Sequence, residues 1–181
     1  DGDMSVGKPK SPKGTKYEKV EFPVFEFSVV GKARYSYTTG QALGRFLAGL
    51  KEGKILGTYC AKCGRVFVPP RMYCSYCFRE VDGWIEAMDE GVVVTAVMSY
   101  ISASRARLEK PMAVGVIKLD VPGYSFDDHF YPGLMHYICG ASEEDVKSMK
   151  IFGARVKARW RPVEQRTGSI TDIECFEVVR P

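Results

Sequence analysis

The sequence predicts a mainly β protein, in which one N-terminal helix precedes a small cysteine-bearing unit and a barrel of about five strands. Three observations support this order: an apolar helical stripe over residues 38–53, two Cys-x-x-Cys pairs within residues 55–83, and short strand-like segments from residue 84 onward. With 45% hydrophobic and 27% charged residues, the chain can bury a core like an ordinary globular protein. No apolar run reaches the roughly 18–20 residues that a membrane span needs, so we expect no membrane association.

Residues 1–37 are expected to form a flexible tail followed by an extended arm. Residues 4–20 are rich in Lys, Gly, Pro and Ser and hold almost nothing to bury. Residues 21–34 contain an apolar stretch, which fits either a segment packed on its own domain or an arm that holds a partner.

Residues 38–54 are expected to form the N-terminal helix. Thr38 followed by Gln41 fits a capping box, and Gly53 can end the helix in a left-handed turn. The apolar residues recur at spacings of three and four and so share one face. They are Ala42, Leu43, Phe46, Leu47 and Leu50.

Residues 55–83 hold the most specific motif, two Cys-x-x-Cys pairs separated by ten residues. The four cysteines are Cys60, Cys63, Cys74 and Cys77. Zinc binds four thiolates in a tetrahedron, and two such pairs on adjacent hairpins provide them. Gly64 permits the left-handed turn that such a pair favours, whereas Phe78 occupies the same place after the second pair. Four thiolates leave no position for water, so we expect a structural Zn²⁺ in a zinc ribbon; the alternatives are a redox dithiol or four buried cysteines.

Residues 84–181 are expected to form the barrel. The predicted strands cover residues 84–88, 91–101, 112–119, 154–161 and 170–179. Gly115 lies where a barrel strand could bend. Ser142 and Asp145 fit a capping box that opens a short helix ending near Met149, between the third and fourth strands. Five strands with a helix in this place are the plan of an OB-fold barrel.

The strand over residues 154–161 alternates between apolar and basic side chains. The outward residues form a basic stripe, which consists of Arg155, Lys157, Arg159 and Arg161. Arginine binds phosphate well, so Arg155, Lys157 and Arg159 are candidates for contact with a phosphate-bearing ligand or with an acidic partner, and a merely solvated face is equally compatible. Binding of single-stranded nucleic acid is a less favoured alternative, because Trp160 faces away from the stripe and the net charge is only weakly basic. The formal value of +4 falls to about +2 once four thiolates and one Zn²⁺ are counted.

Other reactive side chains are few. Cys139 and Cys175 are expected to lie apart from each other and to have no catalytic role. His136 is expected to pack among apolar neighbours. His129 follows two acidic residues, Asp127 and Asp128, which fits an acid/base cluster or a second metal site less well than a solvated loop. We therefore expect a chain that is not catalytic alone. Because four of its six cysteines form metal-type pairs, we expect a cytoplasmic location.

The run LKEGKILGTYCAKCG at residues 50–64, with Pro69-Pro70-Arg71 and the second cysteine pair, resembles the zinc-ribbon plus OB-fold proteins associated with acyl-CoA metabolism. The agreement continues in GARV at residues 153–156, in WRP at residues 160–162, and in Arg166, Gly168 and Asp172. The resemblance covers roughly residues 40–179. It implies an N-terminal helix, a rubredoxin-like ribbon and a C-terminal OB-fold. It also implies a small accessory subunit of a thiolase-like enzyme, in some cases of an acyl-CoA hydratase or synthase, that helps to form the CoA or acyl-CoA site. With this resemblance, the phosphates that Arg155, Lys157 and Arg159 are candidates to contact are those of CoA.

Residues 121–141 depart from shorter relatives and show no clear secondary structure. The segment is nevertheless rich in aromatic and apolar residues, including Phe130, Tyr131 and Tyr137. Exposure of so many apolar groups is unfavourable. We expect the segment to pack either on the chain's own barrel and arm or on the enzyme partner.

Overall fold

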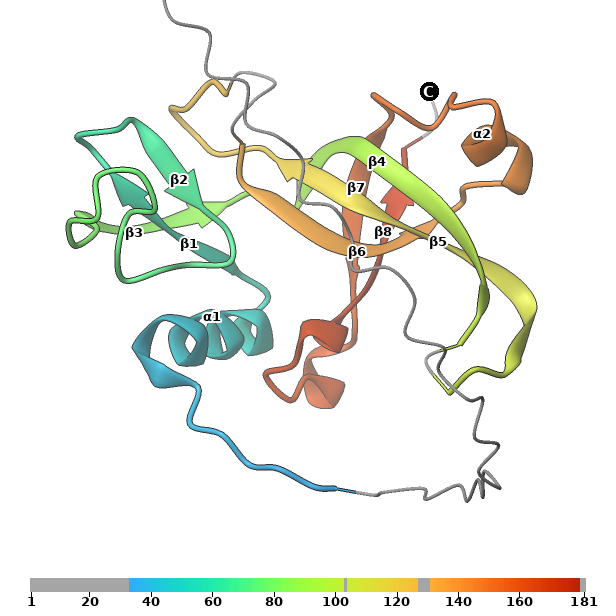
Figure 1. Ribbon diagram of the computed structural model, residues 1–181, viewed down its shortest axis with the longest axis horizontal. Coiled ribbons are helices and arrows are strands. Elements are labelled where there is room, and N and C mark those ends of the chain that lie inside the picture. The colour runs from blue at the N-terminus through green and yellow to red at the C-terminus, as the bar shows by residue number, and fades with distance from the viewer. Residues whose placement is uncertain (1–32, 103, 127–130, 180–181) are drawn as a thin grey trace, which may run out of the picture. The chain divides into compact units, whose positions relative to one another are not determined.

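The computed structural model describes residues 33–102, 104–126 and 131–179 (Figure 1). The predicted tail, most of the predicted arm, and the group Asp127, Asp128 and His129 lie outside the described residues. The helices and strands of the described residues all belong to one unit, Tyr37–Pro181. The prediction of a mainly β chain with an N-terminal helix, a ribbon and a five-stranded barrel is confirmed.

The N-terminal helix, α1, covers Gly40–Glu52 and buries Phe46 and Leu50. Gly53 ends it in the left-handed conformation with φ 81°, as predicted. The predicted capping box at Thr38 is wrong. The residue before the helix is Thr39, whose backbone is already helical and whose side chain makes no capping hydrogen bond, because a capping side chain needs an extended backbone to reach the free N–H groups.

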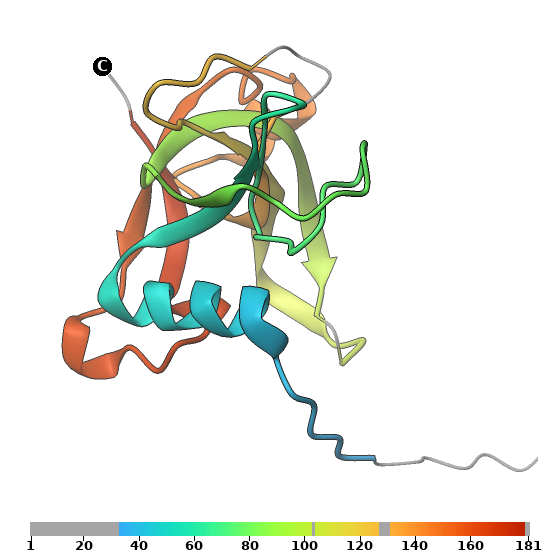
Figure 2. The same cartoon turned by 90° about the vertical axis from the view of Figure 1, so that its left-hand side faces the viewer.

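The ribbon is a three-stranded antiparallel sheet. Its strands are β1 Ile55–Cys60, β2 Arg65–Phe67 and β3 Gly83–Ala87, in the order β2-β1-β3. The predicted strand at residues 84–88 therefore exists as β3, but its assignment to the barrel is wrong, because β3 pairs with β1. The register places Ile55 opposite Ala87, and both are buried in a cluster with Phe46 and Leu50 of α1. Figures 1 and 2 show α1 beside β1 and the two short 3-10 helices η1 Val163–Gln165 and η2 Ile170–Asp172.

The barrel closes in the strand order β4-β5-β6-β8-β7. Its strands are β4 Glu90–Ile101, β5 Arg107–Leu119, β6 Gly133–Cys139, β7 Arg155–Trp160 and β8 Ile173–Val178. The helix α2 Glu143–Lys147 lies between the third and fourth of these strands and has the predicted capping box of Ser142 and Asp145. The OB-fold plan is thus confirmed with β6 in place of the segment at residues 84–88.

Strand β6 lies inside the segment for which no secondary structure was predicted. Its inward residues Leu134, His136 and Ile138 are buried, whereas Met135 and Tyr137 face outward. Buried and exposed side chains alternate regularly along β6. The hydropathy of the sequence does not show this alternation, because the outward side chains are nearly as apolar as the inward ones. The expectation of a long irregular segment is therefore wrong for Gly133–Cys139.

Gly115 lies at a close approach between β5 and β4. A Cβ atom there would overlap the carbonyl oxygen of Thr95. A register shift between Val93 and Thr95 on β4 marks a bulge at the same place. The glycine thus allows the bulged strand to come close to β5, as expected for a bend in a small barrel.

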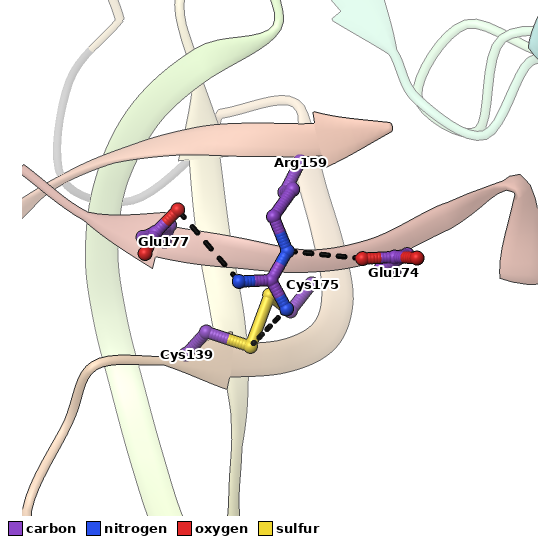
Figure 3. The surroundings of a disulfide bond; sticks show 5 residues. All are labelled: Cys139, Arg159, Glu174, Cys175 and Glu177. Carbon is purple, nitrogen blue, oxygen red and sulfur yellow. Dashed lines mark hydrogen bonds and ion pairs between the residues drawn. A yellow bond between two sulfur atoms is a disulfide. The ribbon is translucent and has the colours of Figure 1, made fainter. Parts of the chain in front are cut away.

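The barrel closes at a short parallel seam between β6 and β8. Only Ile138 and Cys139 pair there, with Phe176 and Glu177. A disulfide joins Cys139 to Cys175 at this seam, with a Cα–Cα distance of 5.8 Å (Figure 3). The prediction that these cysteines are separate is wrong, because residues 36 positions apart meet only through pairing of non-adjacent strands.

Candidate metal centre

The four cysteines of the ribbon converge on one point. Their Sγ atoms all lie within 4.8 Å of one another, and Cys60 Sγ is 3.7 Å from Cys77 Sγ. Zn–S bonds of about 2.3 Å in a tetrahedron put sulfur atoms roughly 3.8 Å apart. Cys60 and Cys74 are buried, and Cys63 and Cys77 are partly exposed. The donor set and its spacing therefore fit a four-thiolate zinc site.

Two turns of the same hand present the sulfur atoms. Gly64 follows the first cysteine pair with φ 61°, and Phe78 follows the second with φ 57°. Phe78 therefore differs from Gly64 in residue type but not in backbone conformation, since both residues are left-handed. Its side chain is 80% exposed, so no local packing explains why a bulky residue occupies a left-handed position.

Asp82 braces the first turn, a role that the sequence analysis missed. Its Oδ2 atom accepts a hydrogen bond from the N–H of Ala61 at 2.7 Å, and its Oδ1 atom pairs with Arg79 at 2.8 Å. Buried Thr58 performs a similar task behind the site, because its hydroxyl donates to the carbonyl of Arg71 and accepts from the N–H of Arg71. Such outer contacts orient the ligands of a metal site.

The thiols differ in acidity. Burial raises the pKa of Cys60 and, with the neighbouring thiols Cys77 and Cys74, takes the pKa of Cys63 to about 12. Burial also opposes ionisation of Cys74, but the backbone N–H groups of Cys77 and Tyr76 outweigh it and lower the pKa of Cys74 to about 6. One thiol therefore ionises readily, while the full set of thiolates requires a bound cation.

The basic stripe on β7 is paired with acidic residues. Arg155 contacts Asp120 at 2.6 Å and Glu90 at 3.4 Å, and Lys157 contacts Glu90 at 3.0 Å. Arg159 contacts Glu174 at 3.0 Å and Glu177 at 3.8 Å, beside the disulfide (Figure 3). The outward orientation of the three residues is as predicted, but their charge is largely balanced within the barrel. Their contact with CoA phosphates stays a prediction.

Asp172, within the motif GSITD, has a structural role that the sequence analysis did not recognise. It is fully buried and accepts hydrogen bonds from the N–H groups of Thr167, Gly168 and Ser169 at 2.7–3.1 Å. Burial opposes ionisation, but these three N–H groups, with a contribution from Arg161, bring the pKa of Asp172 below its usual value. The signal was present, because Ser169 and Asp172 have capping-box spacing.

His136 is buried, as expected for a packing residue. Its ring lies 5.8 Å from that of Phe176, and its Nε2 atom is 3.1 Å from the carbonyl oxygen of Ile170. An open hollow of about 390 Å³ lies between the ribbon and the start of β6, with Arg71 and Tyr131 among its lining residues. No helix of the described part of the chain is long and apolar enough to cross a membrane.

Two family models match the chain in succession. Residues 47–82 match the ChsH2 rubredoxin-like zinc ribbon domain, and residues 84–161 match the ChsH2 C-terminal OB-fold domain. Among solved structures, a DUF35-family protein of unknown function from Sulfolobus solfataricus is 28% identical, with 77% of this chain and 84% of that chain covered and a TM-score of 0.52. The Ltp2-ChsH2(DUF35) aldolase is 17% identical, with 74% and 92% covered and a TM-score of 0.50, a likeness of fold alone. No curated protein gives a significant match.

Proposed function

The chain belongs to the family of ChsH2 proteins, whose zinc ribbon and OB-fold domains it carries in succession, and from this premise we propose that it is the accessory subunit of a thiolase-type acyl-CoA complex. The pair of domain matches is the observation on which the proposal depends. A protein of the same fold occurs in the Ltp2-ChsH2(DUF35) aldolase, which supports assembly with a second enzyme. The subunit itself is non-catalytic, stabilises the enzyme and helps to form its CoA or acyl-CoA site.

We infer that the ribbon holds one structural Zn²⁺. Support comes from the four sulfur atoms within 4.8 Å of one another and from the match to a zinc ribbon domain. Four thiolates fill the tetrahedron, so the ion supplies cross-linking rather than a bound nucleophile. The residues that hold it are Cys60, Cys63, Cys74 and Cys77.

A shared acyl-CoA site has two candidate locations on this chain. The first is the stripe of Arg155, Lys157 and Arg159, although acidic neighbours balance its charge. The second is the hollow lined by Arg71 and Tyr131, because its single cation lies beside apolar walls that suit an acyl or pantetheine group. We propose a cytoplasmic location, because a zinc ribbon needs its thiolates reduced. The Cys139–Cys175 disulfide would be an exception among the cysteines there.

Coexpression with a thiolase-like protein from the same genome tests the proposal. We expect a stable heteromer that processes acyl-CoA, while the isolated chain neither cleaves nor condenses acyl-CoA. Turnover by the isolated chain, or failure to bind the enzyme, would contradict it. An absorbance ratio at 260 and 280 nm typical of bound nucleic acid would instead favour the alternative of a single-strand binding module.

A further inference from the structure

The outer surface of the barrel is divided into two unlike halves. On β7 and β8 the outward residues are charged, and Arg155, Lys157 and Arg159 each contact a carboxylate. On β4, β5 and β6 the outward residues are uncharged over most of their length. We call the second half the outer apolar face, and it consists of Val97, Met112, Val114, Val116, Met135 and Tyr137.

The strand register makes this face continuous. Val97 pairs with Val114, and Val114 pairs with Tyr137, so three apolar side chains cross the sheet in one row. The adjacent row places Val116 opposite Met135. Val97 is 61% exposed and Met135 is 69% exposed. A monomeric protein seldom leaves neighbouring rows of this kind in water, and such patches commonly mark an interface.

An excess of positive charge lies at one end of the face, where three cations surround one exposed carboxylate, Glu109. Arg105 lies in the turn between β4 and β5, and Arg107 and Lys110 follow on β5. All three are exposed, and within the described residues none of them forms an ion pair. The basic stripe of β7 shows that this barrel can balance cations with its own acids. A net excess of cations beside an apolar surface fits a partner that supplies further carboxylates.

We propose that the outer apolar face binds the enzyme subunit, through an apolar patch on that subunit with acidic residues on the side next to the β4–β5 turn. The inference rests on the proposed function, because it identifies which surface of the chain meets the enzyme. A second copy of this chain fits less well. It would bring the same three cations, and among residues 104–112 only Glu109 offers a carboxylate to meet them.

Matched substitutions test the proposal in the coexpressed complex. Met135→Glu and Val97→Glu place a charge within the face. Met149→Glu and Val163→Glu place the same charge at residues that are 64% and 66% exposed elsewhere on the chain. We expect the first pair to weaken assembly about 30-fold or more, as for central anchor residues, and the second pair to assemble normally. All four isolated chains should keep the melting temperature of the unsubstituted chain, because each side chain is already mostly in water.

A charge variant provides a second, independent readout. The double variant Arg107→Ala/Lys110→Ala should slow association and make it less sensitive to salt, while the dissociation rate changes little. Binding measured at two ionic strengths with the purified enzyme gives both rates.

Each result distinguishes this inference from the proposed function. If the unsubstituted chain forms no complex with the enzyme, the proposed function is wrong, and the inference falls with it. If the complex forms and Met135→Glu and Val97→Glu assemble like their controls, the interface lies elsewhere and only the inference is wrong. If the isolated chain forms a dimer and Met135→Glu converts it to a monomer, a second copy of the chain is the occupant of the face. If nucleic acid copurifies with the unsubstituted chain but not with the Arg107→Ala/Lys110→Ala variant, nucleic acid is the occupant of the face. Either result overturns the inference.

Discussion

Removal of the Cys139–Cys175 disulfide should destabilise the barrel strongly, because the ladder that it joins is only two residue pairs long. The parallel ladder between β6 and β8 contains two residue pairs, Ile138 with Phe176 and Cys139 with Glu177. The cross-link closes a loop of 36 residues. In the chain-entropy account, a loop of this length contributes about 4 kcal/mol to the free energy of unfolding. For a chain of this size that corresponds to a fall in Tm of roughly 8–16 °C.

The assay is thermal and urea unfolding of the zinc-loaded chain. The double variant Cys139→Ser/Cys175→Ser is compared with the unsubstituted chain, each with and without a phosphine reductant. We expect the reductant to lower the Tm of the unsubstituted chain to that of the double variant and to leave the double variant unchanged. Zinc content, measured in parallel, controls for damage to the ribbon. Stabilities within about 1 kcal/mol of each other under oxidising conditions would refute the reasoning, because the seam would then be held by packing alone.

Three further predictions concern single residues. Cys63→Ser should abolish stoichiometric zinc binding and unfold the ribbon; a variant that keeps its zinc and its Tm would contradict the proposed site. Phe78→Gly should raise the free energy of unfolding by about 0.5–1 kcal/mol, because glycine adopts φ 57° without the Cβ penalty of phenylalanine; a less stable variant in urea titration would show that the ring has a packing role. Asp172→Asn should destabilise by about 3 kcal/mol through loss of charged hydrogen bonds. Since the pKa of Asp172 is lowered by folding, its contribution should be full above about pH 4 and be lost as the pH falls through the folded value. If the free energy of unfolding of Asp172→Asn and of the unsubstituted chain depends on pH in the same way, Asp172 does not make this contribution.

Much of the fold could be predicted from local patterns. The cysteine spacing identified the four sulfur atoms that meet within 4.8 Å. The apolar stripe identified α1, and the capping box of Ser142 and Asp145 identified α2. These features are encoded within a few residues, so pairing between distant segments does not affect them.

The errors concern pairing between distant segments and one hidden pattern. The strand β3 was expected in the barrel, but it pairs with β1, where Ala87 lies opposite Ile55 and is buried in the core cluster. Cys139 and Cys175 meet only because β8 closes the barrel beside β6. Strand β6 was missed because Met135 and Tyr137 on its outer side are apolar. The same two apolar side chains form part of the proposed docking surface.

The strand order of the barrel has a consequence for the synthesis of the chain. The strand β8 pairs with both β6 and β7, so the barrel stays open until Ile173–Val178 has left the ribosome. The three ribbon strands and all four cysteines of the metal centre lie before residue 88. At ordinary rates of translation, roughly 5–20 s pass between synthesis of the last ribbon strand and synthesis of β8. During that interval the nascent chain can capture a metal ion in a finished ribbon, while the apolar interior of the unfinished barrel is still open to chaperones.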